Sequence, residues 1–443
     1  MAKPSASVAL GTERGHSPGN LEWAFVNYLL FIVRNRSFLG FGMLMMFSSS
    51  FGQTYFISLF GAELRAEFGL SHGDVGLMYS VATFASGMTL IWLGRKIDHV
   101  DLRVYSLATC AGMIFATVFI ALIPAGGFLF IAFYLLRLTG QGLLSHIGVT
   151  SMARYFERDR GKAISIAAMG LPVGEAFLPI IVVTLVAVIG WRGTWLTTTA
   201  FIVVVLVPAT LLLLRGHAAR HDAWAEETEK AQIASDKGTG QRQWRLREVV
   251  RDVRFWFVAA AALAPGFVMT GLFFHQVHLA DAKGWSLPWL ATTFLGYAIS
   301  VVATSMLTGP LVDRFRASRL LPYYLPPLAV AMLVLILFDH PASALAYMIA
   351  AGMSIGAGHT LVMSMWAEVY GTAHLGAIRS LVQALMVAIS AMSPFVFGEL
   401  FDVGVTIETV AGACLIYVVA ATVVLKVAFR DLNDPRREAE SAP

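Results

Sequence analysis

Apolar and polar segments alternate along this chain with the spacing of membrane-crossing helices. Twelve runs of mostly apolar residues, each about 20 residues long, are separated by short polar or charged segments. A helix of that length, rising about 1.5 Å per residue, crosses a hydrocarbon core about 30 Å thick. The expected spans cover residues 38–59, 75–93, 104–123, 128–150, 163–188, 195–214, 255–279, 288–312, 320–338, 342–366, 377–400 and 408–427.

The arrangement of these runs predicts an all-α membrane protein with twelve transmembrane helices in two pseudo-symmetric six-helix bundles. The bundles correspond to residues 38–214 and 255–428, joined by the polar segment 215–254. We interpret 215–254 as a solvated tether, with a regulatory or partner-binding role as the alternative. Residues 1–37 form an N-terminal segment with an expected interfacial helix over 21–33, and 429–443 form a tail.

Composition agrees with a lipid-embedded chain. Hydrophobic residues make up 57% of the sequence and charged residues 14%, against about 25% charged residues in an average soluble domain. The two cysteines, Cys110 and Cys414, fall in separate expected spans, which favours structural thiols over a disulfide. No H-E-x-x-H motif occurs, so we expect neither a metal nor a cofactor.

Basic residues indicate the orientation of the chain in the membrane. Of the 32 lysines and arginines, 28 fall in the termini, the central segment and the loops after even-numbered spans. Positively charged loops stay on the cytoplasmic side, so we expect both termini there. We expect a multi-pass protein of the bacterial cytoplasmic (inner) membrane. The net charge of +4 follows from this topology and does not indicate a nucleic-acid partner.

A short motif recurs in the two halves. Gly94 to Asp98 and Gly309 to Asp313 both have the form G-x-x-x-D, and they lie 215 residues apart. Two loops that recur in register at this separation indicate an internal duplication.

With these paired loops and its six-plus-six spans, the chain resembles the major facilitator superfamily over nearly its full length. The family pattern continues with basic residues, which Arg103 and Arg314 match, whereas His99 and Asp101 depart from it. The resemblance implies a gating role for the loop residues, with helix capping as the alternative. The gating residues are Gly94, Asp98, Arg103, Gly309, Asp313 and Arg314, and the candidate partners of the aspartates are Arg154, Arg158, Arg160 and Arg379.

Two ionisable residues lie deep inside spans, where a charge is costly. Arg137 precedes the turn near Phe156 by 19 residues, and Glu175 follows it by 19, so the two lie at similar depth on adjacent antiparallel helices. We expect them to neutralise each other as an ion pair. The pair is either structural or functional; in the second case protonation of Glu175 frees Arg137 to hold an anion and couples protons to solute.

The resemblance also implies that helices 1, 4, 7 and 10 line the central cavity. The polar residues of those helices, Gln53, Arg137, Gln276 and His359, are therefore our predicted solute contacts. A histidine or glutamine on an apolar helix is also compatible with a hydrogen-bonded packing role.

These features predict a secondary active transporter that works by alternating access. One deep arginine favours a monocarboxylate-like anion, and residues 371–379 resemble the monocarboxylate and oxalate branch of the superfamily. The alternative is a proton-driven efflux antiporter for hydrophobic compounds, because residues 170–175 partly match an antiporter motif. No catalytic motif is present, so we expect no enzyme activity. The expected partners are a small solute, protons and the lipid bilayer, and we expect a monomer.

Overall fold

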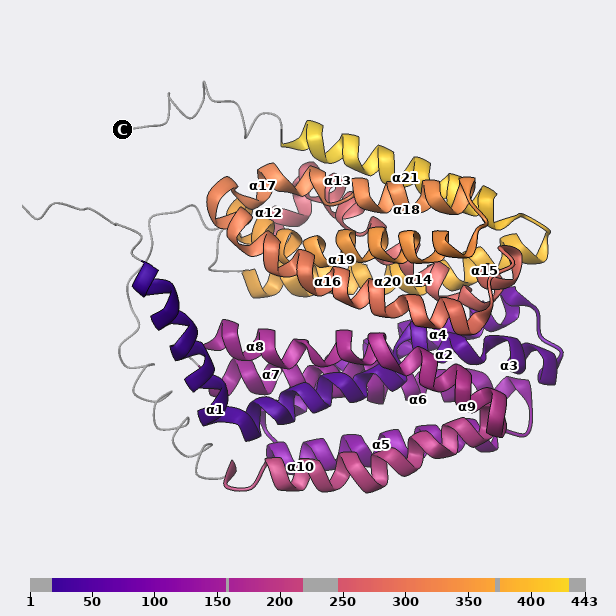
Figure 1. Cartoon of the computed structure of the whole chain (residues 1–443), viewed down its shortest axis with the longest axis horizontal. Helices are drawn as coiled ribbons and strands as arrows, with labels where there is room; N and C mark the ends of the chain where they lie inside the picture. Colours follow the sequence, from indigo (N-terminus) through magenta and orange to yellow (C-terminus); the bar gives the residue numbers. More distant parts are fainter. Residues whose placement is uncertain (1–17, 157–158, 218–245, 371–374, 430–443) are drawn as a thin grey trace, which may run out of the picture.

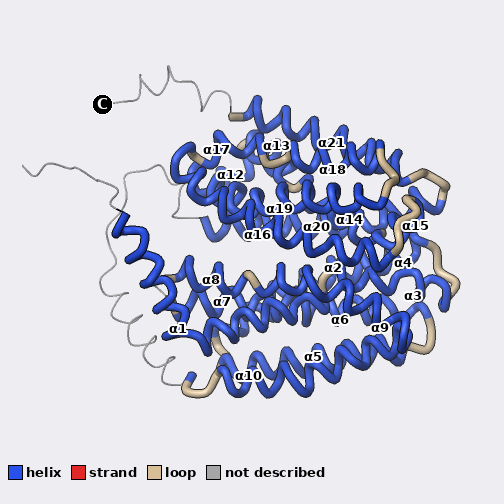
Figure 2. Tube along the Cα trace, in the orientation of Figure 1, coloured by secondary structure: helices blue, strands red, loops and turns tan. Residues whose placement is uncertain are grey.

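The computed structural model describes residues 18–156, 159–217, 246–370 and 375–429. Within those ranges the chain is helical, and no strand occurs (Figure 2). Eleven helical segments are long and apolar enough to cross a membrane. One of them, Arg160–Leu213, has 54 residues and contains a non-helical residue, Gly190, with φ 72° and ψ 170°. Gly190 divides this segment into two spans, so the described helices agree with twelve spans. The predicted all-α fold is confirmed.

The first bundle begins with a helix longer than expected. The sequence suggests an interfacial helix before the first span, but α1 runs without a break over Pro18–Ser49. The other elements of this bundle are α2 Thr54–Ile57, α3 Gly61–Phe68, α4 His72–Gly94, α5 Leu102–Leu122, α6 Leu129–Leu136, a π-helix over Arg137–Leu144, α7 Ser145–Tyr155, α8 Arg160–Ala168, α9 Gly170–Phe201, a π-helix over Ile202–Leu206 and α10 Val207–Leu213.

The second bundle has the same plan. Its elements are α12 Leu246–Arg251, α13 Val253–Ala262, α14 Ala264–Phe274, α15 Gln276–Ala282, α16 Leu287–Phe315, α17 Ala317–Leu320, α18 Pro326–Leu337, α19 Pro341–Tyr370, α20 Leu375–Asp402 and α21 Ile407–Ala428. Helix 7 of the sequence prediction is interrupted at His275, so that α15 lies beyond the apolar span Phe255–Phe274.

The two bundles lie side by side with their helices roughly parallel to the long axis of the molecule (Figure 1). Helix α1 begins, and α21 ends, at the same end of the molecule, which we call the termini end. The opposite end, where α3 and α15 lie, is the distal end. The ribbons of the two bundles diverge toward the termini end.

Small residues bring the bundles into close contact on the distal side. A Cβ on Gly76 of α4 would meet the backbone of Pro394 and Phe395 in α20, and one on Gly398 would lie 2.7 Å from the carbonyl carbon of His72. Glycine allows such an approach of two helix backbones, as small residues do at helix interfaces in membranes. We call the contact between the two bundles on this side the distal seam. Where α4 meets α20, it depends on the absence of side chains at these glycines.

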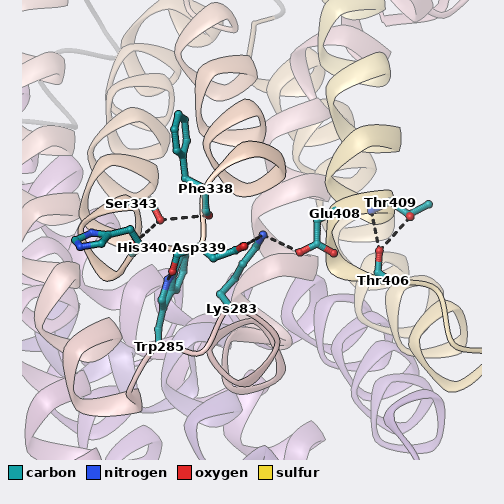
Figure 3. A network of polar contacts seen from close by, with 9 residues as sticks. All are labelled: Lys283, Trp285, Phe338, Asp339, His340, Ser343, Thr406, Glu408 and Thr409. Atoms are coloured by element: carbon teal, nitrogen blue, oxygen red, sulfur yellow. Dashed lines mark hydrogen bonds and ion pairs between the residues drawn. The ribbon is translucent and has the colours of Figure 1, made fainter.

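An ionic cluster closes the distal end of the second bundle (Figure 3). The side chain of Lys283 is 1% exposed, and its Nζ lies 2.7 Å from Oδ1 of Asp339 and 2.7 Å from Oε1 of Glu408. Trp285 donates from Nε1 to the carbonyl oxygen of Asp339 at 2.8 Å. Burial opposes the charge of Lys283, but its hydrogen bonds to the two carboxylates outweigh that effect and raise its pKa. The cluster ties α15 to the start of α19 and of α21.

Candidate functional site

Two local departures from α-helix face each other in the middle of the first bundle. Helix α1 ends at Ser49, a short 3₁₀ turn follows over Ser50–Gly52, and Gln53 is extended, with φ −80° and ψ 154°. Opposite this interruption, the fourth span is π-helical over Arg137–Leu144. A Cβ on Gly140 would lie 2.6 Å from Cα of Gly52, so the two backbones are in direct contact. Interrupted helices and π-bulges are frequent at binding sites in membrane proteins.

Arg137 is the first residue of this π-helix and is buried, with 4% of its surface exposed. Its Nη1 donates to the carbonyl oxygen of Gly52 at 3.2 Å, and its guanidinium lies 5.3 Å from the centre of the Tyr79 ring. Its Nε is buried without a hydrogen-bond partner among the described residues. Among the described residues, the guanidinium therefore contacts one carbonyl and one aromatic face, and it forms no ion pair with a carboxylate.

Glu175 lies on α9 on another side of the interrupted segment. A Cβ on the preceding Gly174 would lie 3.2 Å from the hydroxyl of Tyr55, and a charge on Glu175 would act on the hydroxyls of both Tyr55 and Tyr297. Tyr297 belongs to α16, so Glu175 is close to the contact between the two bundles.

The expected ion pair between Arg137 and Glu175 is absent from the described part of the chain. Equal distance from a turn fixes the depth of two residues, but it does not fix the direction in which each points around its helix axis. Arg137 points to helix 1 at Gly52, whereas the helix that carries Glu175 meets it at Ser50 and Tyr55. The interrupted segment of helix 1 thus contacts both helices and replaces the direct pairing.

The other predicted solute contacts have different surroundings. Gln276 is buried in the seam, and its Nε2 donates to the carbonyl oxygen of Tyr55 and to Oγ of Ser58, both at 2.7 Å. It joins the bundles in this conformation. Gln53 is half-buried at the break in helix 1, and His359 is exposed within α19. Solute contact by all four residues stays a prediction.

The predicted gating loop of the first half is held by arginines. Asp98 forms an ion pair with Arg154, whose Nη1 also donates to the carbonyl oxygen of Ile97 at 3.0 Å. Arg103 donates from Nε to the carbonyl oxygen of Leu214 at 2.9 Å, so it caps the end of the sixth span. Beside Gly94 lies His146, whose Nε2 is 3.1 Å from the Gly94 carbonyl oxygen. Among the described candidate partners of Asp98, the structure pairs it with Arg154; Arg158 lies outside the described residues.

The copy in the second half is built differently. No described atom lies within 4 Å of a Cβ on Gly309, so this glycine does not lie at a close contact between described helices. Arg314 is exposed, with its guanidinium 5.1 Å from the centre of the Phe315 ring. The side chains of Asp313 and Arg379 lie outside the described residues. Instead, Glu368 accepts hydrogen bonds from the backbone nitrogens of Ala317 and Ser318, so a carboxylate of α19 holds this loop.

The distal seam contains contacts that the motif search did not find. Oγ of Ser58 donates to the carbonyl oxygen of Phe273 at 2.7 Å, and these two residues are 215 positions apart. Equivalent positions of the two halves therefore meet across the seam. The carboxylate of Asp402 in α20 accepts from the backbone nitrogens of His72 and Gly73, at 3.0 and 2.6 Å, and so caps α4 from the other bundle. The offset of 215 residues between the two motifs also relates Ser58 to Phe273, so the duplication could have indicated this contact.

Two six-helix bundles from one duplicated chain, packed around interrupted helices, define the architecture of a secondary transporter. A sequence model of the Major Facilitator Superfamily matches residues 42–429. The chain belongs to this superfamily, as the sequence resemblance predicts, and it is a transporter and not an enzyme.

Individual relatives are distant. Over 147 residues the chain is 28% identical to the probable L-galactonate transporter of Escherichia coli (strain K12), a match that covers 32% of this chain and 31% of that protein. The fold is similar to that of a mutant of the nucleoside transporter NupG, with a TM-score of 0.67, 12% identity and coverage of 89% and 99%. It is also similar to an inward-facing, occupied bacterial homologue of the human lysosomal transporter Spinster, with a TM-score of 0.61, 16% identity and coverage of 89% and 97%.

Proposed function

We propose that this transporter carries a monocarboxylate-like organic anion across the bacterial inner membrane and couples its movement to protons. In this proposal the termini end faces the cytoplasm, as the distribution of basic residues suggests, and the distal end faces outward. The two bundles rock about the central site and expose it to one side at a time.

The observation that carries the proposal is the burial of Arg137 without a carboxylate partner. A guanidinium in the bundle interior is costly unless it is paired, and here its neighbours are the Gly52 carbonyl and the Tyr79 ring. A solute carboxylate would supply the missing negative charge, and the planar guanidinium matches a carboxylate in shape. The partial relative named for L-galactonate, itself an organic anion, supports the same class of solute.

Glu175 is the candidate proton carrier. It is half-buried beside the contact between the bundles, and the described residues show no ion pair to it. A carboxyl group in that position favours its neutral form in the closed seam. Opening of the seam would bring water to Glu175 and allow it to release or take up a proton, which links its protonation to the conformation of the transporter.

Uptake of radiolabelled L-galactonate into proteoliposomes, with an imposed pH gradient, tests the proposal. Arg137→Lys keeps the charge but loses the two-pronged geometry, so we expect uptake to fall at least tenfold, with Arg36→Lys on the exposed face of α1 as the control. Glu175→Gln should leave solute exchange intact and remove the acceleration by the pH gradient.

Two outcomes would contradict the proposal. Full uptake by Arg137→Lys would exclude direct binding of the anion. Transport of a lipophilic dye in place of every organic acid tested would favour the efflux antiporter. Retained pH-driven uptake in Glu175→Gln would leave anion binding in place and move the coupling to another group.

A further inference from the structure

Three histidines gather where the two bundles meet at the distal end. His72 is the first residue of α4, whereas His275 and His278 flank and occupy the start of α15 in the other bundle. The ring of His72 lies 4.7 Å from that of His278 and 5.7 Å from that of His275, between ring centres. Their contact therefore exists only while the distal seam is closed.

In the closed seam, an extra proton on these rings would find few hydrogen-bond acceptors. His275 is 3% exposed, and its Nε2 is bonded to the carbonyl oxygen of Pro394 at 2.8 Å. Nδ1 of His72 is buried and has no hydrogen-bond partner in the described structure. Protonation would give each ring two N–H groups and a charge, so a buried donor without an acceptor would result at His72.

Charged groups from several neighbouring elements lie around this cluster, and some of them act on it. A pocket on the scale of a single water molecule, too small for an organic solute, is lined by residues that include His72, His275 and Arg65. Burial, and then the charge of Arg65, lower the pKa of His278, while nearby carboxylates act in the opposite direction. The charged and titratable groups around the cluster are Glu63 and Arg65 on α3, Asp74 on α4, Asp281 on α15, and Glu399 and Asp402 on α20.

We propose that His72, His275 and His278 form an external proton-binding site that opens the distal seam when it is protonated. The inference takes the outward orientation of the distal end from the proposed function, but it does not depend on Glu175 or on the identity of the solute. Two imidazolium rings at 4.7 Å, beside an arginine, repel each other, and this repulsion acts between the bundles. Separation of α4 from α15 returns both rings to water.

The direction of the pH effect follows from linkage. In the closed seam burial and Arg65 lower the pKa of His278, and a proton on His72 would lack an acceptor, so the open state binds more protons and gains population as the pH falls. With an open-state pKa near 6.5, a histidine that is protonated only in the open state shifts the open-to-closed ratio by up to about tenfold between pH 8 and pH 5.5. His72 and His278 face each other across the seam, so together they would shift it by up to about hundredfold, whereas His275 stays bonded to Pro394 of its own bundle. An acidic exterior would therefore favour the outward-open, solute-accepting state.

Distance measurements between spin labels test this site in the full-length protein, in lipid nanodiscs and without solute. Labels at Ala66→Cys on α3 and Val403→Cys after α20 report the seam, because both positions are exposed and lie in different bundles. Native Cys110 and Cys414 are buried. We expect the long-distance population to grow at least tenfold relative to the short one from pH 8 to pH 5.5. His72→Gln with His278→Gln should abolish that growth.

The matched control is His340→Gln, which removes an exposed histidine of the distal loops away from the seam. It should respond to pH as the unmodified protein does. If the double variant is not monodisperse, His278→Gln alone should reduce the response to about tenfold. A pH-independent distribution in the unmodified protein, or an unchanged response in a folded histidine variant, would overturn the proposal. In the Glu175→Gln background the response should persist, which separates this site from proton coupling in transport.

Discussion

Substitution of Gly52 by alanine tests whether the contact between helices 1 and 4 holds the central site together. A Cβ at Gly52 would overlap the carbonyl oxygen of Leu136 and would lie 2.5 Å from the backbone nitrogen of Gln141 and 2.8 Å from Cα of Gly140. All three are backbone atoms, which cannot rotate away as a side chain would. The π-helical segment must then move, at a cost of about 1–3 kcal/mol for overpacking.

The same movement displaces the Gly52 carbonyl from Arg137. That hydrogen bond is 3.2 Å long, and a bond to a charged group contributes about 1.5–3 kcal/mol. We therefore expect Gly52→Ala to unfold several degrees below the unmodified protein in detergent and to lose most of its anion uptake in proteoliposomes. Thermal unfolding monitored by size-exclusion chromatography and uptake of L-galactonate measure the two effects separately.

Gly412→Ala in α21 is the matched control. No described atom lies within 4 Å of a Cβ at Gly412, so the new methyl group meets open space. Alanine also favours the helix over glycine by up to about 1 kcal/mol, so this variant should be as stable as the unmodified protein or more stable. If Gly52→Ala matched Gly412→Ala in both assays, the contact would have no structural or functional weight, and our reading of the site would be wrong.

Two further predictions concern the ion pairs. Asp98 is 57% exposed, so its ion pair with Arg154 contributes little, and Asp98→Asn should lower the free energy of unfolding by only about 0.2–1 kcal/mol. If the loop has a gating role, the same variant should slow transport. A large loss of stability, or unchanged transport, would contradict that role. Asp101→Asn, which keeps a good helix cap on α5, is its control. Hydrogen bonding to Arg192, and then to Trp191, lowers the pKa of Glu67 despite partial burial. This contribution to stability is present above the ordinary pKa of glutamate and is lost as the pH falls through the lower, folded-state value. In unfolding midpoints measured from pH 3 to pH 7, Arg192→Gln should lose that acid-dependent part, whereas Arg36→Gln should keep it.

Hydropathy alone predicted the helical fold, because a bilayer requires long apolar helices whatever their tertiary contacts. It did not predict where helices are interrupted. The break in helix 1 at Gln53 and the break in helix 7 at His275 fall inside apolar runs without proline at either position. Contacts with neighbouring helices decide such breaks, and these contacts join residues far apart in sequence.

In the candidate site, too, some features could be predicted from the sequence and others depend on tertiary contacts. The depth of Arg137 and Glu175 could be predicted from their distance to a shared turn, but their pairing could not, since it depends on which way each side chain points. For Asp98 the sequence predicted a partner among a few arginines, because these arginines all follow the fourth span. Glu368 was missed, because it performs with a carboxylate the task that Arg154 performs with a guanidinium in the other half.

Each half has an ion pair at the same place at the distal end, but the acidic and basic residues have changed places between the two halves. In the first bundle Arg192 binds Glu67 at 2.6 Å, and in the second Lys283 binds Glu408 at 2.7 Å. Lys283 and Glu408 lie 216 residues beyond Glu67 and Arg192 respectively, so each pair joins equivalent helix ends. An ion pair has the same energy when its two charges are exchanged, and a duplicated fold is therefore free to exchange them.

Each of these ion pairs lies within one bundle, whereas the hydrogen bonds that we describe across the seam go to backbone and hydroxyl groups. Ser58 and Gln276 make neutral ones, and the carboxylate of Asp402 accepts from backbone nitrogens of the other bundle. Such bonds exchange with water at a small net cost when the seam opens, about 0.5–1.5 kcal/mol for each neutral one. Strong ties inside the bundles and replaceable ties between them are what rigid-body rocking requires. The exchange of charges between the halves thus keeps strong ties within each bundle, as the proposed alternating access requires.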